Sequence, residues 1–160
     1  MLDKKETYYG YKVHVLCTLE GHVTDYVITP ASSDDRAAIY ELIEGYERPL
    51  TLLGDKGYIG DDLAAELLAQ YGVTLIAMKR DNAKKPHPKA FRQFIFKLRR
   101  RIETSISQLC GQLSVENVTA KSLWGLHTRI VLKFLAFNLC WLINSLLGHD
   151  HVSWIKRLVY

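Results

Sequence analysis

Cysteine and proline are scarce in this sequence, and each scarcity excludes a class of protein. The three cysteines, Cys17, Cys110 and Cys140, form no CxxC pair and are an odd number, which argues against a disulfide-stapled secreted domain. Only four prolines occur in 160 residues, and no low-complexity tract is present, which excludes a proline-rich or disordered chain. The sequence also shows no basic signal peptide. We therefore expect a reduced, cytoplasmic, globular chain.

A long unbroken apolar run is also missing. The most apolar segment, Arg129 to Gly148, is interrupted by Lys133, Asn138 and Asn144. We interpret it as a helix that lies deep between other elements or at a subunit contact, such as that of a homodimer. We expect no membrane partner, and a membrane span is the alternative. Just before it, Trp124 and Leu126 are expected to pack this helix against the sheet, with stacking of the aromatic ring on a nucleic-acid base as the alternative.

The sequence has enough apolar residues for one compact core. It is 48% hydrophobic and 11% aromatic over 160 residues, a length that suits one domain better than two. We expect a single domain over residues 1–160, with a sheet and two helices in residues 1–80 and a helical part in residues 91–160.

The order of periodic segments predicts an α/β fold. Tyr8 to Leu19 and residues 22–30 read as a hairpin around the turn at Glu20 and Gly21. A helix follows, with Ser33 or Asp34 as its cap. Strands at residues 50–58 and 73–78 then flank a helix over residues 61–72, and a long helix runs from about residue 91 to 113. The order ββαβαβ predicts a mixed sheet flanked by helices, followed by C-terminal helices.

Positive charge is concentrated in one stretch. Lys79 to Arg101 contains ten Lys or Arg residues and one acid, Asp81, for a net charge of +9. Because the whole chain carries +4, the remaining residues sum to −5. Such a run is typical of a surface that binds a polyanion such as nucleic acid, and equally of a solvated helix face.

Two acids stand in positions suited to metal chemistry. Asp55 follows an apolar strand, in TLLGDKGYIGDD, and Glu103 lies on one helix face with Phe96 and Arg99, in FKLRRRIETSISQL. Carboxylates from distant parts of a chain suit Mg²⁺ or Mn²⁺, and two such ions can activate a nucleophile in phosphodiester chemistry. The structural alternative is an Asp that caps a helix and a Glu that pairs with Arg99 or Arg100.

Several blocks of the sequence resemble bacterial insertion-sequence transposases of the DDE type. These blocks are KKETYYGYKVHVLCTLEGHVTDYVITPASSDDRAA, LLGDKGYIG, RRRIETSISQL and AKSLWGLHTRIVLKFLAFNL, in the family's order and intervals. The resemblance implies a ribonuclease-H-like fold in which three acids bind two divalent metals. It assigns Asp55 as the second acid and Glu103 as the third, both as catalytic residues and metal ligands.

Two departures from the family pattern limit what the resemblance implies. The first acid belongs to a strand that precedes the hairpin, so we expect a partial catalytic domain, truncated at its first strand, that binds Mg²⁺ or Mn²⁺ weakly and is inactive by itself. The family's basic position near the third acid is occupied by Cys110, which weakens a DNA contact there.

The resulting hypothesis is a transposase-type domain that cleaves DNA and transfers strands by two-metal phosphoryl transfer. DNA, as transposon ends and target, is the expected partner. The alternative is a non-catalytic nucleic-acid-binding remnant or a dimerising fragment, so whether this chain is an enzyme stays open. The residues predicted to contact DNA are Lys56, Lys79, Arg80, Lys84, Lys85, Arg92, Arg99, Arg100 and Arg101.

Overall fold

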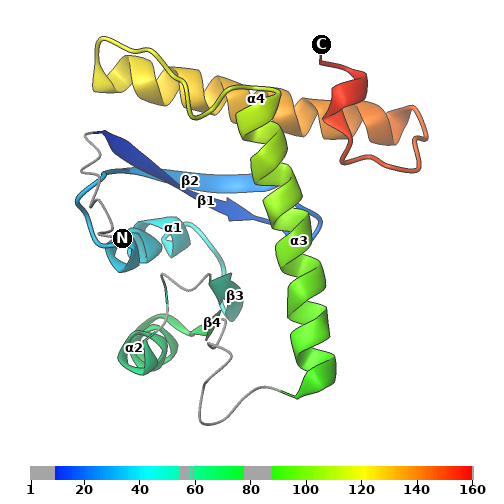
Figure 1. Cartoon of the computed structure of the whole chain (residues 1–160). Helices are drawn as coiled ribbons and strands as arrows, with labels where there is room; N and C mark the ends of the chain where they lie inside the picture. Colours follow the sequence, from blue (N-terminus) through cyan, green and yellow to red (C-terminus); the bar gives the residue numbers. More distant parts are fainter. Residues whose placement is uncertain (1–9, 55–57, 59, 78–87, 160) are drawn as a thin grey trace, which may run out of the picture. The chain divides into compact units, whose positions relative to one another are not determined.

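The computed structural model describes residues 10–54, 58, 60–77 and 88–159. The chain divides into two compact units, which we describe separately. The first unit comprises residues up to Val15 and Tyr26–Arg92, and the second comprises Leu16–Asp25 and Gln93–Tyr160. Figure 1 shows the elements in chain order, from the β1–β2 hairpin to the C-terminal turn η3.

The hairpin consists of β1 (Tyr11–Cys17) and β2 (Val23–Pro30), as the sequence predicts. Backbone hydrogen bonds join Ala31 to Gly10 at its open end and Thr18 to His22 at its turn, which is the antiparallel arrangement. Gly21 in the turn has φ of +107°, and a Cβ at this position would lie 2.5 Å from Ser105 Oγ. Only glycine fits this turn without strain.

The first unit also contains a parallel strand pair with a helical crossover. Strands β3 (Leu50–Gly54) and β4 (Val73–Ala77) pair in parallel, with Leu50 opposite Val73 and Gly54 opposite Ala77. Helix α2 (Asp61–Tyr71) connects them, as parallel strands require, and it buries Leu63 and Leu67. It ends at Gly72, whose φ of 61° closes the helix in the left-handed conformation.

The short helix before β3 begins at the cap predicted from the sequence. Asp34 accepts a hydrogen bond from the backbone N–H of Arg36, and the turn η1 (Asp35–Ala37) leads into α1 (Ala38–Ile43). The apolar stripe of this helix is buried and consists of Ile39, Leu42 and Ile43.

The second unit is built from two long helices around the tip of the hairpin. Helix α3 (Lys89–Gly111) begins within the first unit and continues through the second, and α4 (Leu123–Leu146) is capped by Ser122, which accepts from the Gly125 N–H at 3.1 Å. The turn η3 (Ile155–Arg157) lies against α4 (Figure 1). The buried residues of α4 include Ile130, Phe134, Phe137, Trp141 and Asn144.

Helix α4 is not enclosed all round. One face is buried, but the opposite face exposes large apolar side chains. Trp124 is 82% exposed, so the prediction that it packs the helix against the sheet is wrong. Among the described helices, α4 alone is long and apolar enough to cross a membrane by length and composition, and 28% of its most apolar window is buried.

The predicted α/β class and the helix and strand order agree with the structure. The strands, however, form two separate two-stranded sheets within the described residues instead of one mixed sheet. The short turn between β1 and β2 and the helical crossover between β3 and β4 specify these two strand pairs. Whether the edge of one pair joins the edge of the other depends on hydrogen bonds between segments distant in the sequence. The tip of the hairpin groups with the helical unit, and the single-domain assignment stays a prediction.

Candidate functional site

Glu103 projects from the outer face of α3. The helix buries Ile95, Leu98 and Leu109 along one side, and at 100° per residue Glu103 lies well away from that side. Its side chain is 58% exposed. The carboxylate Oε1 accepts a hydrogen bond from Arg99 Nε at 2.6 Å, one turn earlier. The structure therefore presents a solvated carboxylate beside one arginine, as the structural alternative anticipates.

Polar contacts on the opposite face fix the position of α3 in its unit. Ser105 is buried and donates from Oγ to the Gly21 carbonyl at 3.0 Å. Gln108 Oε1 accepts from the backbone N–H of Ile155 at 3.0 Å. Both bonds form only when Ser105 and Gln108 face these backbone groups. They therefore fix the rotation about its own axis of the helix that carries Glu103.

Asp55 lies outside the described residues, together with five of the predicted DNA contacts. The described chain reaches Gly54 at the end of β3, and a Cβ built on Gly54 would lie 3.0 Å from Cβ of Tyr58 and 3.2 Å from Cδ1 of Leu75. Glycine at this position therefore lets Tyr58 approach the end of the strand. The shared metal site of Asp55 and Glu103 stays a prediction. The DNA contacts outside the described residues are Lys56, Lys79, Arg80, Lys84 and Lys85.

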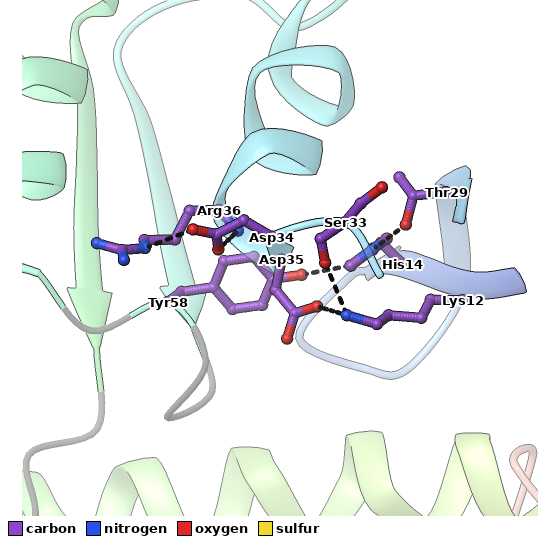
Figure 2. A network of polar contacts seen from close by, with 8 residues as sticks. All are labelled: Lys12, His14, Thr29, Ser33, Asp34, Asp35, Arg36 and Tyr58. Atoms are coloured by element: carbon purple, nitrogen blue, oxygen red, sulfur yellow. Dashed lines mark hydrogen bonds and ion pairs between the residues drawn. The ribbon is translucent and has the colours of Figure 1, made fainter. Parts of the chain in front are cut away.

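A polar network surrounds Tyr58 in the first unit (Figure 2). His14, on β1, lies with Nδ1 2.9 Å from the Tyr58 hydroxyl and with Nε2 3.0 Å from Oγ1 of Thr29 on β2. Both ring nitrogens are therefore occupied, and the side chain is buried. Neither His14 nor Tyr58 is predicted as a functional residue from the sequence; the available signal is a histidine within the strand Tyr11–Cys17.

An ion pair continues this network toward the start of η1. Lys12 Nζ lies 2.8 Å from Oδ1 of Asp35 and donates to the Ser33 carbonyl at 2.8 Å (Figure 2). Burial lowers the pKa of His14 below its ordinary value; Asp35 opposes this shift and Lys12 adds to it. The network thus ties the hairpin to the start of η1 and to Tyr58.

The described basic residues are spread around the surface of α3. Arg92, Arg100 and Arg101 are exposed, and Arg99 is half-buried and paired with Glu103. Phe94 and Phe96 are also exposed, between these cations in the sequence. Aromatic side chains among arginines are typical of surfaces on which bases stack. The sequence run that predicted DNA binding is therefore displayed to solvent in its described part.

Comparison of the sequence with known proteins identifies its family. A family model described as "Transposase DDE domain" matches residues 2–139, which include Asp55 and Glu103. The chain belongs to the DDE transposase domain family. No curated protein and no solved structure matches it significantly. Membership associates this chain with DNA as partner, with DNA cleavage in transposition and with a divalent metal, at the level of the family.

Of the two predicted metal ligands, Glu103 is the one that lies within the described residues. Glu103 is a solvated carboxylate with hard oxygen donors, which suits Mg²⁺ or Mn²⁺. Within residues 10–54, 58, 60–77 and 88–159, no group of three or more His, Cys, Asp or Glu is placed to hold a metal. The donor chemistry therefore fits at Glu103, and the second predicted ligand, Asp55, lies outside this range.

Cys110 gives the transposase domain a neutral position where the family pattern has a cation. Burial, with a contribution from Glu116, raises the pKa of the Cys110 thiol to about 11. The side chain is therefore a thiol at neutral pH and brings no positive charge to α3. The weakened DNA contact at this position stays a prediction.

Proposed function

We propose that this domain takes part in DNA cleavage and strand transfer, with Asp55 and Glu103 as metal ligands. The observation that carries the proposal is the family match over residues 2–139, which includes both acids. Their placement after a strand and on a helix is the one that the resemblance assigns to the second and third acids. The exposed carboxylate of Glu103 supports the second of these assignments.

Each described residue has a distinct task in this proposal. A divalent ion, when bound, supplies activation of the attacking oxygen and stabilisation of the leaving oxygen. Glu103 offers its carboxylate from a helix whose rotation is fixed by Ser105 and Gln108. Arg99 orients that carboxylate through its hydrogen bond at 2.6 Å. The exposed cations Arg92, Arg100 and Arg101 bind DNA phosphates and place the backbone along α3.

The second candidate function is nucleic-acid binding without chemistry. It is favoured by the exposed basic and aromatic side chains of α3, because binding DNA through them requires no metal. The resemblance assigns two of the three acids to this sequence, and an incomplete set binds divalent ions weakly. We therefore propose that the 160-residue chain, by itself, binds DNA and leaves it uncut.

Metal titration tests the ligand assignment without relying on activity. Binding of Mn²⁺ to the chain is measured by the loss of the electron paramagnetic resonance signal of the free ion. The affinity for Mn²⁺ should be lower in Asp55→Asn and in Glu103→Gln than in the parent. The matched controls are Asp62→Asn and Glu44→Gln, which alter exposed acids elsewhere and should bind as the parent does. Equal binding by all five proteins would rule out Asp55 and Glu103 as the ligands.

We also propose that the domain acts in the cytoplasm, where DNA is available and thiols stay reduced. All three cysteines are free, and burial raises the pKa of Cys17 to about 11, which keeps that thiol unreactive. Cell fractionation with an antibody to the chain tests the proposal. Recovery in the membrane fraction would contradict it.

A further inference from the structure

The outward face of α4 carries an apolar stripe with no partner among the described residues. We define the α4 stripe as the exposed apolar side chains Trp124, Val131, Leu132, Leu135, Leu139, Leu142, Ile143 and Leu146. At 100° per residue they lie on one side of the helix, and the buried Ile130, Phe134 and Phe137 lie on another. Scattered exposed leucines need no explanation, but a contiguous stripe of this length is typical of an interaction surface.

The spacing of the stripe specifies the kind of partner. Its central line runs through Leu132, Leu135, Leu139, Leu142 and Leu146, at alternating intervals of three and four residues. This is the average period of 3.5 at which two long helices keep their apolar residues in register against each other. The stripe is therefore shaped to pack along another helix with the same repeat.

Charge also favours an identical helix as the partner. Helix α4 contains no Asp or Glu, and its two cations are used within the chain: Arg129 donates to the Thr119 carbonyl and Lys133 to the Leu113 carbonyl. Two copies of a chain with net charge +4 repel each other through most surfaces. Two copies that meet through the α4 stripe bring no like charges together. Electrostatic repulsion therefore opposes self-association little on this face.

The area of the stripe is sufficient for a weak dimer. From Trp124 to Leu146 the helix is about 33 Å long and about 10 Å wide, so half of its cylinder is roughly 500 Å². Two copies would bury roughly 1,000 Å², which is at the lower limit for a specific interface. The expected dimer therefore dissociates on dilution.

Two asparagines of α4 argue against the membrane as the occupant. Asn138 exchanges two hydrogen bonds with the backbone of Val23, and Asn144 donates to the carbonyls of Val152 and Trp154. A membrane span would remove these partners and leave amide groups in hydrocarbon. We propose that the α4 stripe pairs with the α4 stripe of a second copy of this chain.

Sedimentation equilibrium of the whole chain tests this pairing. The parent should form a concentration-dependent dimer in the micromolar range, and the variant Leu135→Lys/Leu142→Lys should dimerise at least about 100-fold more weakly, because lysines would be buried unpaired. The matched control is Leu68→Lys on α2, since Leu68 is 57% exposed and Leu135 is 54% exposed. The control should dimerise as the parent does, and circular dichroism checks that each variant is folded.

Charge exchange distinguishes direct contact from an indirect effect. In a parallel pair, Lys at positions 135 and 142 faces Glu at the same positions, and in an antiparallel pair centred midway between the two positions, residue 135 of one copy faces residue 142 of the other. Mixing the double Lys variant with Leu135→Glu/Leu142→Glu should therefore restore a dimer that neither variant forms alone.

Three results would overturn the proposal. The first is a parent that stays monomeric at several hundred micromolar, and the second is a dimer that the double Lys variant leaves intact. The third is a monomer that co-sediments with phosphatidylcholine–phosphatidylglycerol vesicles and loses this binding when the stripe is changed, which would assign the face to lipid.

Discussion

His14 and Tyr58 are joined by a contact of 2.9 Å between Nδ1 and the phenolic oxygen, although 44 residues separate them in the sequence. The histidine belongs to the hairpin, and the tyrosine follows Asp55 by three residues. The contact therefore ties Tyr58 to the hairpin. Thr29 completes the arrangement by occupying the other ring nitrogen.

Loss of this contact should destabilise the fold. His14→Phe fills the buried site but leaves the hydroxyls of Tyr58 and Thr29 without their ring partner, at a cost of about 1–3 kcal/mol in the free energy of unfolding. Tyr58→Phe should cost less, about 0.5–1.5 kcal/mol, and the double variant should cost less than the sum. Urea unfolding measures all three. Tyr11→Phe, at an exposed position, is the control, and strict additivity would show that the two side chains do not interact.

The lowered pKa of His14 predicts a direction for the pH dependence of stability. Burial favours the neutral ring in the folded chain, so the unfolded chain takes up a proton first as the pH falls below about 6.5. The contribution of His14 is complete above that value and is lost as the pH falls through its lowered folded pKa. The free energy of unfolding should therefore decline from pH 7 toward pH 5, and His14→Gln should show a smaller decline. His151→Gln, at an exposed position, should keep the parent slope.

The exposed arginines of α3 should bind DNA by contacting its phosphates. Arg100→Ala and Arg101→Ala should each weaken binding on all sequences alike and lower the salt slope by about 1. Arg99→Ala should have a smaller effect, because Glu103 already neutralises part of the Arg99 charge at 2.6 Å. Fluorescence anisotropy at several salt concentrations measures this, with Lys121→Ala outside the helix as control. A salt-independent affinity would identify α3 as a solvated face without a DNA role.

The 160-residue chain alone should neither nick DNA nor join strands with Mg²⁺ or Mn²⁺. The reason is chemical: two-metal phosphoryl transfer requires carboxylates on both ions, and the resemblance assigns two acids of three. A nicking and strand-transfer assay compares the chain with Asp55→Ala/Glu103→Ala. Metal-dependent cleavage by the parent that disappears in the double variant would contradict this prediction and would show that another acid completes the site.

Local patterns in the sequence determined most of the elements. The capping side chain of Asp34, the closing glycine Gly72 and the apolar stripe of α1 all act within a few residues, so their effect can be read from the chain. The turn at Gly21 and the long helix that carries Glu103 follow from the same short-range rules. The resemblance that identified Asp55 and Glu103 likewise required only the order of residues.

Tertiary structure decided what those elements do together. The pairing of His14 with Tyr58 depends on two segments 44 residues apart, and no local rule specifies which buried hydroxyl a histidine meets. The same holds for α4: its sequence is apolar nearly all round, and only packing determined that Phe137 is enclosed while Leu135, two residues earlier, is exposed. Burial is a property of what covers a side chain, so the sequence determined the helix and the tertiary structure determined which of its faces remains available.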